Sequence, residues 1–99
     1  MQAITPWGEI RVSWISKGEG RGEIHVAHYE ALSGHEAKLE KLVTTLKGRT
    51  KSFTKEFWVI TMRDGHEANE TTAIAFVQAI TNLATREETK AKKAETRER

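Results

Sequence analysis

The first third of the chain alternates between apolar and polar residues, as β-strands do. Ile10, Val12 and Trp14 are separated by polar neighbours, which predicts a half-buried strand with these three side chains on one face. A second alternating segment covers about residues 23–31. Three glycines lie in segment 17–22 between the two patterns, and this arrangement predicts a flexible hairpin connection.

The next apolar stripe has the spacing of a helix. Its members recur at intervals of three and four residues, at Leu39, Leu42, Val43 and Leu46. Ahead of the stripe, Ser33 and Glu36 have the spacing of a capping box, which predicts the start of the helix. Beyond it, Gly48 suits the left-handed position that commonly ends a helix. The signals for its start, its buried face and its end therefore all predict the same helix.

Residues 53–62 are predicted to form one strand with two apolar faces. One alternating set is Phe57, Val59 and Thr61, and the other is Trp58, Ile60 and Met62. Because both sets are largely apolar, the pattern is typical of a strand that is covered on both sides.

A second helical stripe follows a turn at Asp64 and Gly65. Its apolar members are Ala73, Phe76, Val77, Ile80, Leu83 and Ala84. We favour Asn69 over Asp64 as the N-cap, because Gly65 would be a poor residue in the first turn of a helix. Past Ala84 the composition still favours helix, with oppositely charged pairs spaced four residues apart. We expect the helix to extend to the mid-90s.

These elements predict a small α+β domain of order β-β-α-β-α. Residues 1–84 would form the core, with a three-stranded, mainly antiparallel sheet and two helices, and residues 85–99 a charged helical extension. If both helices cover one face of the sheet, either the Trp58 set or the Phe57 set is left in water. Either the helices flank both faces or a partner covers one. We favour a partner, in the first place a second copy of the chain as a homodimer.

Composition sets further limits. The chain has 99 residues, a formal net charge of +2 and no cysteine. This length fits one domain, and the lack of cysteine excludes disulfides, thiolate zinc sites and a thiol nucleophile. The sequence shows no signal-peptide pattern and no apolar run long enough to span a membrane. We therefore expect a cytoplasmic protein without membrane contact.

The sequence offers little support for catalysis or metal binding. The glycine-rich loop 18–22 precedes a predicted strand, whereas phosphate-binding loops precede a helix. His25 and His28 are three residues apart in a predicted strand, so they point to opposite faces; His35 and His66 lie elsewhere. No acid, base or metal-ligand set is coherent. We expect no enzymatic activity, no metal site and no cofactor.

The positive charge is concentrated at the C-terminus. Residues 85–99 hold six basic and four acidic side chains, whereas residues 1–84 hold ten of each. At 3.6 residues per turn, four of the basic residues fall within a sector about 60° wide and form what we call the basic ridge: Arg86, Lys90, Lys93 and Arg97. Such a ridge suits an acidic protein surface or a nucleic-acid backbone, although solvated tails of mixed charge also occur without a specific role.

Together these features favour a non-catalytic protein-interaction module of the adaptor or inhibitor kind, as in the accessory proteins of phages and mobile elements. The partner protein would bind an apolar sheet face and the basic ridge, whose charges would set orientation. The expected sheet-face residues are Trp58, Ile60, Met62 and Tyr29. Packing of Trp58 in the core is the competing interpretation. The alternative function is nucleic-acid binding, with phosphates contacted by the basic ridge.

Overall fold

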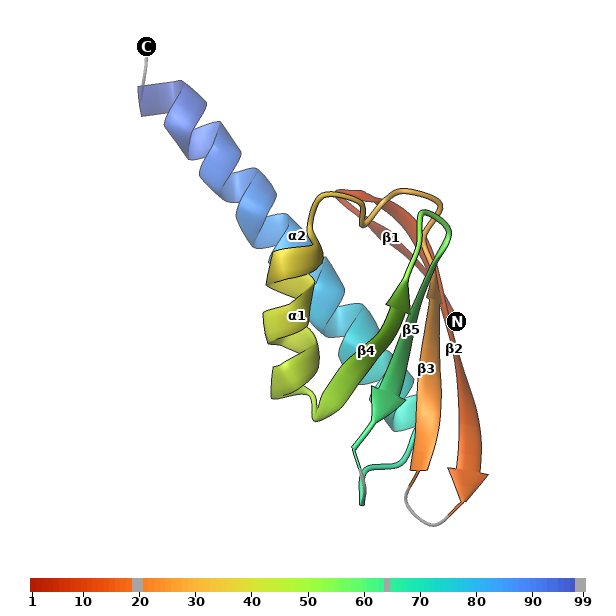
Figure 1. The fold of residues 1–99 in the computed structure, drawn as a ribbon. Helices are drawn as coiled ribbons and strands as arrows, with labels where there is room; N and C mark the ends of the chain where they lie inside the picture. Colours follow the sequence, from red (N-terminus) through yellow and green to blue (C-terminus); the bar gives the residue numbers. More distant parts are fainter. Residues whose placement is uncertain (19–20, 64, 98–99) are drawn as a thin grey trace.

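The computed structural model describes residues 1–18, 21–63 and 65–97, with the side chains of Lys17, Arg21 and residues 91–97 not included. In these residues the elements follow the order β1 (Gln2–Thr5), β2 (Gly8–Gly18), β3 (Arg21–Ala27), α1 (Glu36–Thr45), β4 (Gly48–Phe53), β5 (Phe57–Met62) and α2 (Glu70–Arg97). The described strands form one antiparallel sheet in the order β1-β2-β3-β5-β4 (Figure 1).

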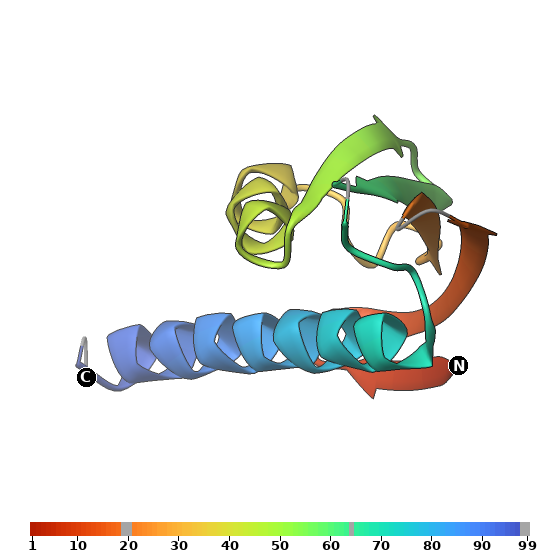
Figure 2. The same ribbon diagram turned by 90° about the horizontal axis from the view of Figure 1, so that it is seen from below.

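The sheet curves around the N-terminal half of α2, and α1 lies to one side, next to β4 (Figure 2). The C-terminal half of α2 projects beyond the sheet (Figure 1). The principal extents of the molecule are 55 × 23 × 20 Å. The long dimension follows from α2, because 28 helical residues at a rise of 1.5 Å each span about 42 Å.

The small α+β domain with two helices and an antiparallel sheet is confirmed, but the predicted strand number and order were wrong. β1 has only four residues, which is too short for an alternating pattern to show. The predicted strand 53–62 is the end of β4 and all of β5. A turn separates them, in which the Thr54 hydroxyl accepts a hydrogen bond from the Phe57 amide at 3.0 Å. β2 and β3 form the predicted antiparallel pair, and residues 19 and 20 of their connection lie outside the described residues.

The junction between α1 and β4 uses Lys47 in the left-handed position that we predicted for Gly48. Lys47 has a φ of 65°, and Gly48 is the first, buried residue of β4. A Cβ atom on Gly48 would lie 2.7 Å from Ile60 Cγ2 and 3.0 Å from Val43 Cγ2. Gly48 is therefore required by the close approach of β4 to its neighbours and not by the turn.

The two helix starts differ in how well the sequence predicted them. Asn69 caps α2 as expected, since its Oδ1 accepts a hydrogen bond from the amide three residues on, at 3.0 Å. The predicted capping box of α1 is not formed. That helix begins at Glu36 after His35, and no described side chain caps its first turn. The Ser33 amide instead donates to the Glu30 carbonyl at 3.0 Å, in a turn that precedes the helix.

The core lies between the concave face of the sheet and the two helices. The Trp58 ring meets the Phe76 ring of α2 edge-on, with centroids 6.4 Å apart and an interplanar angle of 82°. The Trp58 indole N–H donates to the Thr50 hydroxyl at 3.0 Å, so its polar atom is satisfied inside the core. The predicted α2 stripe is confirmed: Ala73, Phe76, Ile80 and Ala84 are fully buried, and Val77 and Leu83 pack against them.

This packing corrects our expectation that the Trp58 set forms an open sheet face. Trp58 and Ile60 are 0% exposed and Met62 is 4% exposed, because that side of β5 faces the core beneath the two helices. The alternate set faces outward: Phe57 is 45% exposed and Val59 is half-buried. The alternation along β5 was predicted correctly. The alternation does not show which of the two sides faces the core, because that depends on where the helices pack.

Candidate interaction site

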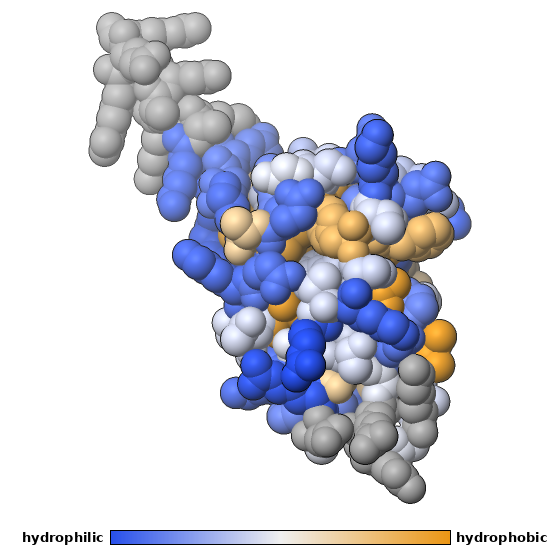
Figure 3. Space-filling view, viewed as in Figure 1, coloured by the Kyte–Doolittle hydropathy of each residue, from blue (hydrophilic) through white to orange (hydrophobic). Residues whose placement is uncertain are grey.

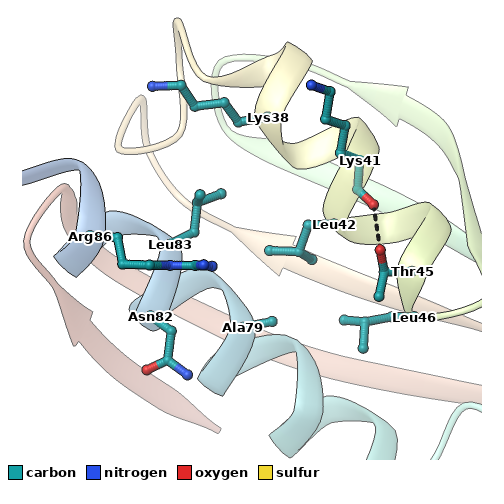
Figure 4. Close-up of a pocket in the computed structure, with 9 residues that line it drawn as sticks. All are labelled: Lys38, Lys41, Leu42, Thr45, Leu46, Ala79, Asn82, Leu83 and Arg86. Carbon is teal, nitrogen blue, oxygen red and sulfur yellow. Dashed lines mark hydrogen bonds between the residues drawn. The ribbon is translucent and has the colours of Figure 1, made fainter. Parts of the chain in front are cut away.

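A groove of about 460 Å³ lies between α1 and α2 (Figure 4). From α1 and the residue after it, the groove is lined by Lys38, Lys41, Leu42, Thr45 and Leu46, and from α2 by Ala79, Asn82, Leu83 and Arg86. The two helices diverge because they pack on different parts of the sheet: α1 contacts mainly β4, whereas α2 packs against the concave face and contacts β1 and β2. The groove is the space left by this divergence.

The floor of the groove is apolar. Leu42 and Leu46 extend from the α1 side toward α2, and Leu83 extends from α2 toward α1 (Figure 4). All three are half-buried, whereas Leu39 and Val43 on the adjacent face of α1 are fully buried. These leucines thus form the outer edge of the core stripes. Their exposed parts remain in water unless another molecule covers them.

The rim of the groove is basic. Lys38 and Lys41 lie on the α1 side and Arg86 on the α2 side, and no carboxylate is present among the described lining residues. Lys38 Nζ is 2.7 Å from Glu87 Oε2, and this ion pair joins the two helices. Lys41 and Arg86 make no ion pair within the part of the chain that the structure describes. The groove therefore presents two uncompensated positive charges around its apolar floor.

The ion pair also affects the titration of Glu87. The hydrogen bond from Lys38 holds the pKa of the Glu87 carboxyl below its ordinary value, with smaller contributions from the charges of Lys38, Lys90 and His35. Glu87 is thus ionised near neutral pH and paired with Lys38, and in the described residues it forms no ion pair with Lys41 or Arg86.

The basic ridge begins at this groove. Arg86 is both a lining residue of the groove and the first member of the ridge, and Lys90 is exposed one turn further along α2. The side chains of Lys93 and Arg97 lie outside the described residues. The sequence predicted the ridge from its spacing. It gave no signal for the groove, because the groove depends on how α1 and α2 diverge.

The outer face of the sheet is a second exposed surface. Ile15 and Phe57 are 48% and 45% exposed, but they lie on different rows of the sheet with polar residues between them. The Glu23 carboxylate accepts a hydrogen bond from Lys51 Nζ at 2.9 Å and contacts His25 Nε2 at 3.1 Å. Glu23 is nearly buried by these neighbours. This polar cluster divides the apolar side chains of the outer face.

Tyr29 does not join the other residues of the predicted sheet-face site. It is 68% exposed and lies in the turn after β3, with a φ of 44°. Trp58, Ile60 and Met62 are buried in the core. The structure therefore does not bring these four side chains together on one surface.

Three cations gather where β4 begins and β5 ends. The Arg63 amide donates to the Lys47 carbonyl at 3.0 Å, which extends the pairing of the two strands by one position. Arg49 lies opposite Thr61 in the register, and Lys47, Arg49 and Arg63 are all exposed. Figure 3 shows strongly hydrophilic surface in this region. We call this group the strand-end cations.

The histidines are dispersed. His28 is 1% exposed, and its Nδ1 accepts a hydrogen bond from the Leu32 amide at 3.4 Å. Burial lowers the pKa of the His28 imidazole. His35 stacks on Trp7 with ring centroids 3.7 Å apart, and burial also lowers its pKa. Among the described residues no three His, Asp or Glu side chains are grouped so that they could hold a metal ion.

Comparison with known proteins gives no match: no protein family, no curated protein and no solved structure is significantly similar to the chain. No helix in the described residues is long and apolar enough to cross a membrane. Among the described surfaces of this structure, the groove between α1 and α2 combines apolar area with uncompensated charge.

Proposed function

We propose that the protein is a non-catalytic protein-interaction module, of the adaptor or inhibitor kind, which binds a partner protein in the groove between α1 and α2. The supporting observation is the set of half-buried leucines within a basic rim. Protein interfaces commonly combine an apolar centre, which supplies affinity, with a polar rim, which sets orientation and association rate.

The projecting part of α2 supplies a second contact for the same partner. Among the described side chains of α2, Ala84 is the last buried one, and the exposed Arg86 and Lys90 follow it. A partner seated in the groove would meet these charges as it continues along α2. The module would act by occlusion, because the partner surface that it covers is no longer open to other molecules.

Affinity capture from extracts of the source cells tests this proposal. The immobilised wild-type protein is compared with Thr45→Glu and Leu83→Glu, and with Phe57→Glu as the control on the outer sheet face. Thr45 is exposed, so its variant alters the groove without changing the core. We expect a protein that is retained by the wild type and by Phe57→Glu and is lost with both groove variants. Retention by both groove variants, with circular dichroism showing that they fold, contradicts the proposal.

A second candidate function is nucleic-acid binding, which the strand-end cations favour. Lys47, Arg49 and Arg63 lie close together through the β4–β5 pairing, and the basic ridge adds further charges. Such contacts would be made to phosphates. Fluorescence anisotropy with labelled duplex DNA would then show affinity that falls with salt, on a log-log slope of about −2 to −4. Arg49→Glu with Arg63→Glu, or Lys90→Glu with Lys93→Glu, would reduce both the affinity and the slope.

We propose that a homodimer of the chain would form through the outer face of the sheet. The inner face is occupied by α2, so a second copy would have to contact Phe57 and Ile15 on the opposite side. Sedimentation at several concentrations tests this, with Phe57→Glu expected to shift a dimer toward the monomer. A monomer at every concentration contradicts it.

A further inference from the structure

We propose that the segment bound in the groove is an acidic amphipathic helix of the partner protein. This inference rests on the proposed function and adds the chemistry of the ligand. Three properties of the groove support it: the nature of its walls, the sign of its charges, and the side chains that it lacks.

The walls of the groove favour a helical ligand. Both walls are helices, whose backbone groups bond within the helix, and the Thr45 hydroxyl also donates within α1, to the Lys41 carbonyl at 3.0 Å (Figure 4). An extended peptide gains affinity by pairing its backbone with a free strand edge, and the described walls offer none. A helix satisfies its own backbone hydrogen bonds. It can then place side chains spaced three or four residues apart over the leucines of the floor.

The charges of the groove favour acidic side chains on both flanks of that helix. Lys41 and Arg86 lie on opposite sides of the apolar floor and make no ion pair within the described residues. Lys90 lies one turn beyond Arg86 on the same helix. Lys38 is already neutralised by Glu87. A ligand with leucine-like residues on one face and Glu or Asp beside that face matches both the floor and the rim.

The same properties argue against two other occupants. A second copy of this chain would offer the segment after Ala84, which has no large apolar side chain and carries the same net sign as the rim. Nucleic acid would meet an apolar floor, and no aromatic side chain for base stacking occurs among the described lining residues. A partner helix with an acidic and apolar surface avoids both conflicts.

The test is a titration of ¹⁵N-labelled protein, followed by amide NMR, with two synthetic helical peptides of 21 residues. In the first, Leu residues recur at intervals of four and three on one face and Glu residues flank them; in the second, each Glu is replaced by Lys. We expect the acidic peptide to shift the amides of Leu42, Leu46 and Leu83 and to bind about tenfold more tightly than the basic one. Lys41→Glu with Arg86→Glu should reverse this preference. Arg49→Glu with Arg63→Glu makes the same change of net charge away from the groove and should preserve it.

Several outcomes would overturn the inference. These are equal affinity for the two peptides, shifts confined to the outer face of the sheet, and displacement of the acidic peptide by duplex DNA. Self-association that is lost with Leu83→Glu would indicate a second copy as the occupant and would also overturn it. The affinity capture distinguishes a failure of this inference from a failure of the proposed function. If capture depends on the groove but the peptides show no charge preference, the inference alone fails; if capture is independent of the groove, the proposed function fails as well.

Discussion

Lys38 on α1 and Glu87 on α2 form an ion pair of 2.7 Å that joins the two helices. The side chains are 46% and 25% exposed, so the pair lies at the surface. Direct contacts between α1 and α2 are few, and each helix packs mainly on the sheet. The pair therefore links the two helices at the edge of the groove between them.

Removal of Lys38 should raise the pKa of Glu87. The hydrogen bond from Lys38 is the largest cause of the lowered pKa of this carboxyl, whose ordinary value is 4.5. In Lys38→Ala, NMR titration of the Glu87 side chain should give a midpoint closer to that ordinary value. Lys41→Ala is the matched control, because Lys41 lies on the same helix and does not contribute to the shift. An unchanged midpoint in Lys38→Ala would show that the pair is absent in solution.

Trp58→Ala should strongly destabilise the fold. The side chain is completely buried against Phe76 and donates a hydrogen bond to Thr50, so its loss leaves both a cavity and an unpaired hydroxyl. We expect the free energy of unfolding in urea to fall by about 3–5 kcal/mol. Trp14→Ala, at a position that is 38% exposed, should have a markedly smaller effect. Equal effects at the two positions, or a stable Trp58→Ala variant that loses only partner binding, would place Trp58 at an interface.

The helices could be predicted from the sequence because their signals are local. The stripes around Val43 and Ile80 and the cap at Asn69 depend on residues within one or two turns of each other. The sheet was harder to predict for the opposite reason. β1 is recognisable only by its pairing with β2, and the split between β4 and β5 depends on the Thr54 turn, which an apolar pattern does not show.

The candidate site was predictable only in its charged part. Arg86 and Lys90 were placed on one helix face by their spacing, and that spacing holds in any helix. The apolar part of the site was predicted around Trp58, because a strand with two apolar faces indicates that both faces are covered by other residues or by a partner. Whether that cover comes from α2 or from a partner depends on tertiary packing. Leu42 and Leu83 were read as core residues, and their half-buried state follows from the divergence of α1 and α2.

Two substitutions at the α1–β4 junction should change the free energy of unfolding in opposite directions. Gly48→Ala places a Cβ atom within 2.7 Å of Ile60 Cγ2, so we expect a loss of about 1–3 kcal/mol in the free energy of unfolding. Lys47→Gly removes a side chain from a left-handed residue with a φ of 65°, so we expect a gain of about 1 kcal/mol. Urea unfolding measures both. A neutral Gly48→Ala variant would mean that β4 does not approach Ile60 as closely as described.

The stability of the fold should decrease as the pH falls below 6.5. Burial lowers the pKa values of His28 and His35 in the folded state, while in the unfolded chain these groups titrate near 6.5. Below that pH the unfolded chain binds more protons than the folded one, so protonation favours unfolding until the lowered pKa values are reached. Thermal unfolding at pH 7.5, 6.5 and 5.5 should show a shallower decline in His28→Gln than in the wild type. His66→Gln, at an exposed position, is the control and should follow the wild type. Identical pH profiles for His28→Gln and the wild type would contradict this account.

Site-specific photo-crosslinking in the source cells tests the central claim most directly. A benzophenone amino acid is placed at Thr45, an exposed lining residue of the groove, and in a second variant at Ser13, an exposed residue on the outer face of the sheet. We predict a covalent complex with a protein other than this chain from position 45, and from position 13 no complex except a dimer of the chain itself. A complex with a different protein that forms only from position 13 would contradict the account, because it would place the partner on the sheet and leave the groove empty.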